Sequence, residues 1–201
     1  MIPKIFHWNW LSNDPIPSRF RDYMVSWLKW NPGWKVYFWT GRNLPPLFNQ
    51  ASFDDAKCWA IKSCILRLEL VYQFGGIYLD SDFECYQPIA PLLDRSVIIG
   101  YETQNSLCDA ILGADQGHPF FRQAVNDYPG LYEKHRAKPH PIKTPYAPSF
   151  GPEYLTHIYS QGWNSKFAGI QSKILYPYYC GESPKRYPET IAAHHWAGTW
   201  R

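Results

Sequence analysis

A long apolar helix that passes through two glycines into a buried strand is the feature that most constrains the fold. Residues 54–74 carry apolar side chains on most sides of a helix, which is typical of a largely buried helix. Gly75 and Gly76 are placed to end it, and residues 77–79, "IYL", have the composition of a buried strand. A buried helix that leads directly into a buried strand predicts an α/β domain.

The rest of the chain continues this alternation. We expect strands at 2–10, 34–40, 77–86, 96–102, 109–114 and 173–180, and further helices at 19–30, 118–128 and 151–162. The opening order of strand, helix and strand is typical of a mixed or parallel sheet with helices packed against it. The chain has 201 residues and shows no internal repeat or linker, so we predict one domain, residues 1–201, with the possibility left open that it belongs to a longer protein.

Composition narrows the class of ligand and the cellular compartment. Aromatic residues make up 18% of the chain, and because they stack on sugars and bases they favour a carbohydrate or nucleotide ligand. A net charge of +3 is too small to indicate a nucleic-acid partner. The five cysteines are odd in number and form no Cys-x-x-Cys pair, which favours a reducing compartment. With neither a signal-peptide pattern nor a transmembrane segment, we expect a soluble, cytoplasmic chain.

Two aspartates, Asp80 and Asp82, follow the central strand, at the edge where open α/β sheets bind ligands. Two such carboxylates repel each other unless a cation lies between them, and their oxygens suit Mg²⁺ or Mn²⁺. The alternative is a polar turn in which Asp82 caps a helix. Arg67 lies inside the apolar helix that precedes the strand, so it needs a carboxylate partner if it is buried.

Several blocks of sequence, in order along nearly the whole chain, carry a family resemblance. They are "IPKIFHWNWLSNDPIP", "SWLKWNPGWKVYFW", "SCILRLELVYQFGGIYLDSDFECYQPIAPLL", "ILGADQGHPFF" and "HHWAGTW". The chain resembles the DXD sugar-binding glycosyltransferases of glycosyltransferase family 32, which include capsular-polysaccharide enzymes and yeast initiating mannosyltransferases. The resemblance implies a GT-A fold, with a central mixed, mostly parallel sheet flanked by helices. It also implies a nucleotide-sugar donor and Mn²⁺ or Mg²⁺ as cofactor.

The resemblance also assigns the residues of a donor and metal site. Asp80 and Asp82 would meet the metal and the donor diphosphate, and either His194 or His195 would complete that group. Arg67 would lie near the donor sugar. Two tryptophans would form the outer parts of the site. Trp10 would stack on the base, and Trp200 would pack over the diphosphate.

At two positions the chain departs from the family pattern. Cys64 stands where the family usually has an aspartate that holds the donor sugar, so the donor is not expected to match that of the relatives, and a deoxy sugar is one alternative. Asp109 stands where an asparagine is expected. It could be the base that takes the acceptor proton in an inverting reaction, or a strand-end aspartate that only accepts a hydrogen bond from the acceptor or from a loop amide.

We therefore expect a metal-dependent hexosyltransferase that moves a sugar from a UDP-sugar, such as UDP-glucose or a related deoxy hexose, to a saccharide acceptor in glycan or polysaccharide synthesis. Its catalytic residues would be Asp109 and Arg67. The alternative is a non-catalytic nucleotide-sugar-binding domain derived from such an enzyme. A metal-dependent phosphohydrolase is less well supported, because no second carboxylate cluster appears.

Overall fold

The computed structural model describes residues 1–136 and 150–198. Its longer helices are α1 (Ser18–Trp30), α3 (Trp59–Phe74), α4 (Pro119–Arg136) and α5 (Pro152–Ser160), with shorter α2 (Gln50–Asp55) and α6 (Ser172–Leu175). The strands are β1 (Ile5–Asn9), β2 (Lys35–Trp39), β3 (Gly76–Leu79), β4 (Phe83–Cys85), β5 (Val97–Tyr101), β6 (Leu107–Ala114) and β7 (Ala192–His194).

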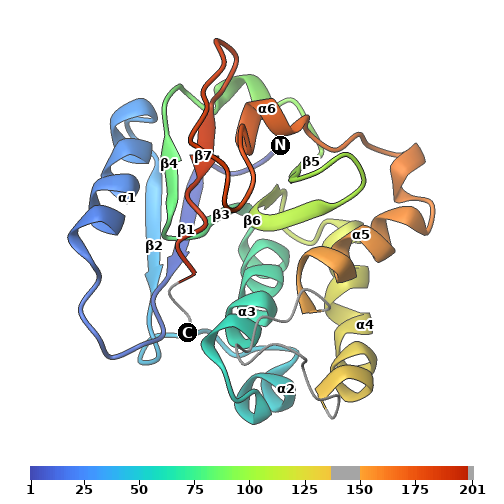
Figure 1. Cartoon of the computed structure of the whole chain (residues 1–201). Helices are drawn as coiled ribbons and strands as arrows, with labels where there is room; N and C mark the ends of the chain where they lie inside the picture. The colour runs from blue at the N-terminus through green and yellow to red at the C-terminus, as the bar shows by residue number, and fades with distance from the viewer. Residues whose placement is uncertain (137–149, 199–201) are drawn as a thin grey trace.

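The central sheet has five strands in the order β2-β1-β3-β6-β5 (Figure 1). β1 pairs in parallel with β2 and β3, whereas β6 is antiparallel to both β3 and β5. All strands of this sheet except β6 therefore run in one direction. A second, antiparallel sheet pairs β4 with β7. The mixed sheet and its flanking helices confirm the predicted fold class.

Two apolar cores lie on the two faces of the central sheet. On one face α3, α4 and α5 form a core that includes Tyr78 of β3. On the other face Trp27 of α1 and Phe83 of β4 form a core with Ile77 and Leu79. Successive side chains of β3 thus enter opposite cores, as the pleat of a strand requires. This double burial explains why the strand before the aspartates has an unbroken apolar sequence.

The expected helix at 54–74 is in fact two helices. α2 ends at Asp55, and α3 begins at Trp59 after an extended Cys58. No residue in this stretch forbids a helix; tertiary contacts divide it. The carboxylate of Asp55 accepts hydrogen bonds from Tyr132 and Arg136 of α4, at 2.8 and 3.0 Å, instead of capping a helix.

The expected strand at 173–180 is wrong. Its first residues form α6, because the place beside β5 is already taken by Ile170, which bridges to Gly100 and exchanges hydrogen bonds with Ile99 and Tyr101. The expected strand at 77–86 is likewise divided into β3 and β4, which belong to different sheets. Within the described residues, no helix combines the length and the apolar composition needed to cross a membrane.

Candidate active site

The paired glycines after α3 determine where the central strand ends. Gly75 and Gly76 have φ values of +64° and +88°. A Cβ on Gly76 would lie 2.7 Å from the carbonyl oxygen of Ile5, so the close approach to β1 requires glycine. The turn sends β3 alongside β1 and delivers Asp80 to the edge of the sheet where Trp10 follows β1.

Arg67 on α3 is buried and holds two carboxylates together. Its Nη2 lies 3.0 Å from Asp80 Oδ1, and its Nη1 lies 2.9 Å from Asp109 Oδ2. Nη1 also donates to the backbone carbonyl of Asp109 at 2.7 Å. A buried guanidinium needs such partners to offset the loss of water. Arg67 therefore joins the end of β3 to β6 beneath the pocket.

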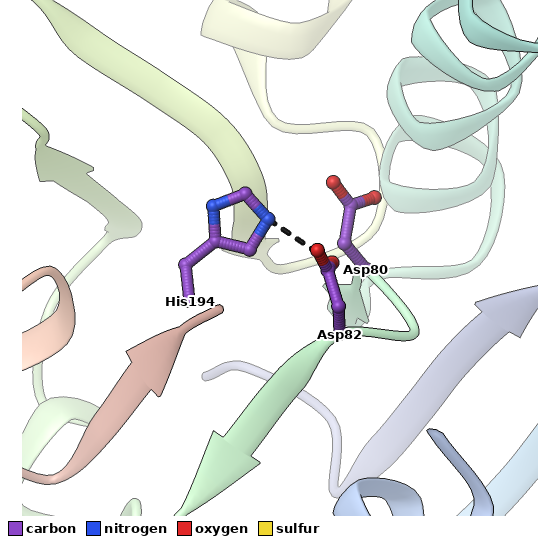
Figure 2. A group of neighbouring side chains, drawn as sticks. All are labelled: Asp80, Asp82 and His194. Carbon is purple, nitrogen blue, oxygen red and sulfur yellow. Dashed lines mark hydrogen bonds and ion pairs between the residues drawn. The ribbon is translucent and has the colours of Figure 1, made fainter. Parts of the chain in front are cut away.

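Asp80, Asp82 and His194 converge on one point (Figure 2). Each offers one ligand atom, and these atoms lie within 4.8 Å of one another. Asp80 follows β3, Asp82 precedes β4, and His194 ends β7, so the group forms where the two sheets meet. Two carboxylates and one imidazole are a ligand set that fits Mn²⁺, because carboxylates suit hard cations and the nitrogen suits a softer one than Mg²⁺.

The segment after β7 holds Asp82. His194 Nε2 lies 3.0 Å from Asp82 Oδ1, and the backbone amide of Ala197 donates to Asp82 Oδ2 at 2.8 Å. Burial alone would raise the pKa of Asp82, but the nearby His194 and the Ala197 amide outweigh it and lower that pKa to about 2. Burial opposes protonation of His194, yet Asp82 and Asp80 raise its pKa above the usual value. His194 Nδ1 is buried and has no partner among the described residues.

Asp80 is in the opposite electrostatic situation. Burial is the main effect and raises its pKa to about 6; Arg67 opposes this rise, and Asp82 adds to it. Asp80 also accepts a hydrogen bond from the Tyr78 hydroxyl at 2.7 Å. Asp82 is thus firmly ionised, whereas the negative charge of Asp80 is only partly compensated by its neighbours. A bound cation would supply the missing positive charge.

These groups line a pocket of about 510 Å³. Its wall includes residues from both sheets, from α3 and from the segment after β7: Trp10, Cys64, Arg67, Asp80, Asp82, Glu102, Asp109, Tyr179, His194 and Trp196. A pocket of this size that joins aromatic surface to a few charged groups has the character of a small-molecule site.

The structure places the other expected site residues as follows. Trp10 lines the pocket, with its indole N–H donating to the Asp14 carbonyl at 2.7 Å. His195 is not part of the three-residue group: its ring nitrogens lie 2.9 Å from Glu84 Oε2 and 2.8 Å from the Tyr178 hydroxyl. Trp200 lies outside the described residues.

The two positions that depart from the family pattern are in contact. Cys64 Sγ lies 3.5 Å from Asp109 Oδ2, and both side chains line the pocket. Burial raises the pKa of the Cys64 thiol well above its usual value, so it remains protonated and can donate to the carboxylate. Asp109 is therefore held from two directions, by Cys64 and by Arg67.

Three of the pocket residues to which sequence reasoning assigned no role are Glu102, Tyr179 and Trp196. Glu102 follows β5, and Tyr179 lies within residues 173–180, the stretch expected to be a strand. Trp196 has a φ of +53°, and its ring centroid lies 4.4 Å from that of His194. Its presence in the quoted "HHWAGTW" block was the one available signal, since the other two residues belong to no motif.

Comparison with known proteins accounts for this geometry. Residues 17–99 match the family described as the glycosyltransferase sugar-binding region containing DXD motif. The match covers 83 of the 201 residues. The DXD region thus comprises α1, β2, α2, α3, β3 and β4, and it contains both aspartates and Arg67.

Relatives and solved structures extend the comparison beyond the DXD region. The chain is similar to inositol phosphoceramide mannosyltransferase 3 of Schizosaccharomyces pombe, with 25% identity over 167 residues, 80% of this chain and 42% of that protein. It is 24% identical to inositol phosphoceramide mannosyltransferase 1 of the same yeast, over 98% of this chain and 63% of that protein. The chain therefore spans less than two thirds of the length of either relative.

Two solved structures share the fold. The PaToxG glycosyltransferase superposes with a TM-score of 0.65 and 16% identity, covering 82% of this chain and 71% of that one. The ligand-free glycosyltransferase domain of the YGT toxin gives a TM-score of 0.59 with 10% identity, covering 85% of this chain and 79% of that one. These likenesses confirm the GT-A type of fold.

Proposed function

We propose that this chain is a metal-dependent glycosyltransferase that moves a hexose from a nucleoside-diphosphate sugar to a hydroxyl of a saccharide acceptor. The observation that carries the proposal is the convergence of Asp80, Asp82 and His194 beside a buried Arg67, in a pocket of about 510 Å³. The family match of residues 17–99 and the names of the mannosyltransferase relatives support it.

Each residue of the pocket has a proposed task. Asp80, Asp82 and His194 would hold Mn²⁺, or Mg²⁺, which when bound neutralises charge on the departing diphosphate. Trp10 would stack on the base, at the end of the pocket formed after β1. Arg67 holds Asp80 in place and carries positive charge beneath the donor sugar. The roles of His195 and Trp200 in donor binding remain predictions.

Asp109 is the residue whose role decides the stereochemistry. It is the candidate base for an inverting reaction. Its Oδ2, however, is already engaged by Arg67 and Cys64, which favours the alternative of a strand-end aspartate that acts only through hydrogen bonds. Measuring the anomeric configuration of the product by NMR separates these roles, because inversion requires a base at the acceptor hydroxyl and retention does not.

The donor sugar is the finer question. The expected donor is a UDP-sugar such as UDP-glucose, and the departure at Cys64 adds a deoxy hexose as an alternative. The names of the two yeast relatives favour mannose. Both sugars therefore belong in the test, together with the non-catalytic binding domain as the alternative function.

The test is calorimetric titration of the purified chain with UDP and with GDP, each with and without Mn²⁺, followed by turnover assays with UDP-glucose and GDP-mannose. We expect metal-dependent binding of one nucleotide and release of that nucleotide during turnover. Asp82→Ala should abolish both, while the surface variant Glu189→Gln should leave both unchanged. Nucleotide binding without any turnover over a broad panel of donors and acceptors would leave the binding-domain alternative.

A further inference from the structure

Glu102 occupies a fixed place at the end of β5. Its backbone amide donates to the Ser106 carbonyl at 2.9 Å, which closes the loop between β5 and β6. The Ser106 hydroxyl donates to Glu102 Oε1, also at 2.9 Å. The carboxylate is therefore held in one orientation by its own loop, and it lines the same pocket as the metal-binding group.

The second oxygen of this carboxylate has no partner. Glu102 Oε2 is buried, and no hydrogen bond reaches it from any described residue. Burial is the main effect and raises the pKa of Glu102, and the nearby Ser106 and Cys108 side chains partly oppose this rise. Leaving a buried carboxylate oxygen unpaired is costly. An unpaired carboxylate oxygen at the wall of a pocket can accept a hydrogen bond from a ligand.

The order of the strands places Glu102 on the side of the pocket away from the base. Along the edge of the sheet, Trp10 follows β1, Asp80 follows β3, Asp109 lies on β6 and Glu102 follows β5. β5 lies one strand beyond β6, a separation of about 5 Å at the usual strand spacing. A donor that extends from Trp10 across Asp80 and ends at Asp109 therefore leaves Glu102 beyond its sugar end.

An aromatic surface connects this corner to the metal-binding group. Tyr179 is 43% exposed, and its ring centroid lies 5.2 Å from that of Trp196. The ring of Trp196 in turn contacts that of His194. A carboxylate beside an exposed aromatic face suits a ligand with hydroxyls on its edge and C–H groups on its face, as a sugar ring has.

We propose that Glu102 and Tyr179 form the acceptor subsite of the pocket, in which Glu102 Oε2 accepts a hydrogen bond from an acceptor hydroxyl and Tyr179 packs against a sugar ring of the acceptor. This inference rests on the proposed function, because it takes the other end of the pocket as the donor site. It assigns to the acceptor a carbohydrate with free hydroxyls next to the reacting one.

The test measures acceptor binding and donor binding separately. Saturation-transfer NMR with methyl α-D-glucopyranoside and methyl α-D-mannopyranoside, in the presence of Mg²⁺ and UDP or GDP, reports on the acceptor side. Calorimetry with the same nucleotide and Mg²⁺ reports on the donor side. The variants are Glu102→Gln and Tyr179→Ala; Glu189→Gln, an exposed carboxylate paired with Lys173 outside the pocket, is the matched control. Glu102→Gln keeps the shape of the side chain, and no existing partner of Oε2 is lost.

We expect the wild type and Glu189→Gln to bind a glycoside, and Glu102→Gln and Tyr179→Ala to bind it at least about tenfold more weakly, with the Kd for the nucleotide unchanged. Unchanged glycoside binding in Glu102→Gln, or an equal loss of nucleotide binding, would overturn the subsite. If the wild type binds nucleotide but neither glycoside, the acceptor subsite is overturned and the proposed function is not. A wild type that binds neither nucleotide refutes the proposed function and, with it, this inference.

Discussion

A second carboxylate at position 64 should destabilise the protein through charge repulsion with Asp109. Cys64 Sγ lies 3.5 Å from Asp109 Oδ2; Asp109 is buried, and Cys64 is half-buried at the wall of the pocket. The backbone at Gly151 closes over the pair, since a Cβ built there would lie 2.5 Å from Asp109 Oδ2 and 3.1 Å from Cys64 Sγ. On the Gly151 side, the new carboxylate of Cys64→Asp therefore has little space in which to move away from Asp109.

The size of the effect follows from two independent arguments. Two unit charges about 4 Å apart repel by about 4 kcal/mol at an effective dielectric constant of about 20. Protonation limits this cost: holding a carboxyl with an ordinary pKa of about 4 in its neutral form at pH 7 requires about 4 kcal/mol. At pH 5 the same protonation requires only about 1.4 kcal/mol. In the folded variant, repulsion raises the pKa of one of the two carboxyls at positions 64 and 109. Cys64→Asp should therefore cost more stability as the pH rises from 5 to 7.

Urea unfolding followed by tryptophan fluorescence, at pH 5 and pH 7, measures this cost. Cys64→Asn is the matched control, because it has the shape of aspartate without the charge. In an Asp109→Asn background the neighbour of residue 64 is neutral, so Cys64→Asp should cost at least about 2 kcal/mol less there than in the wild type. If the cost of Cys64→Asp is the same within about 0.5 kcal/mol in the wild type and in the Asp109→Asn background, at both pH values, the repulsion argument is refuted. The double variant also moves the carboxylate from β6 to α3, and its turnover would show whether the donor sugar needs a carboxylate on one particular wall.

Three further predictions concern the metal group and a buried histidine. Asp80→Ala should abolish Mn²⁺-dependent nucleotide binding in calorimetry while the far-ultraviolet circular dichroism stays that of the wild type; retained binding would exclude Asp80 as a ligand. His194→Gln should weaken Mn²⁺ binding at least about tenfold, whereas His195→Gln should change it less than about threefold, because the His195 ring faces Glu84; equal losses would make both histidines ligands. Burial lowers the pKa of His7 to about 4, so the stability that its neutral ring contributes is complete above about pH 6.5 and is lost as the pH falls toward 4. Urea unfolding of the wild type should therefore lose about 2 kcal/mol more between pH 8 and pH 5 than that of His7→Gln, and equal losses would show that His7 is not held neutral.

The hydrogen bonds of His7 explain why its neutral form is favoured. Its Nε2 lies 2.8 Å from the Gly75 carbonyl oxygen, which can only accept, and its Nδ1 lies 3.1 Å from Trp39 Nε1, which can only donate. A neutral ring with its proton on Nε2 satisfies both partners. A second proton, on Nδ1, would face the indole N–H and break that hydrogen bond.

Local patterns in the sequence predicted the elements that support the DXD motif but not the elements that complete the site. The buried helix, its glycine stop and the apolar strand before Asp80 all depend on neighbouring residues, and each was predicted. The strand β7 was not, because it consists of Ala192, Ala193 and His194, none of which has a strong preference for a strand. It forms because it can pair with β4, more than 100 residues earlier in the chain.

Glu102 shows a different limit of sequence reasoning. The acceptor role proposed for Glu102 depends on the hairpin between β5 and β6. This hairpin places Glu102 in the same pocket wall as residues from β3, β7 and the segment after α6. No spacing in the sequence records that approach. Arg67 is the opposite case: a charged residue in an apolar helix is itself a signal of a buried partner, and the structure supplies Asp80 and Asp109.

The difference between the two aspartates follows from their places on two separate sheets. Asp80 ends the central sheet and is fixed from below by Arg67, whereas Asp82 begins the small sheet and is fixed by the segment that follows β7. Ser81 alone separates the two aspartates where the two sheets meet. A cation bound to both aspartates would therefore link the two sheets and also reduce the repulsion between the two carboxylates. Because the Ala197 amide already occupies Asp82 Oδ2, and His194 its Oδ1, a cation can coordinate Asp82 only by sharing or displacing these contacts. Metal binding and the position of residues 194–197 are therefore coupled: a variant that loosens this segment should weaken Mn²⁺ binding even when all three ligands are present.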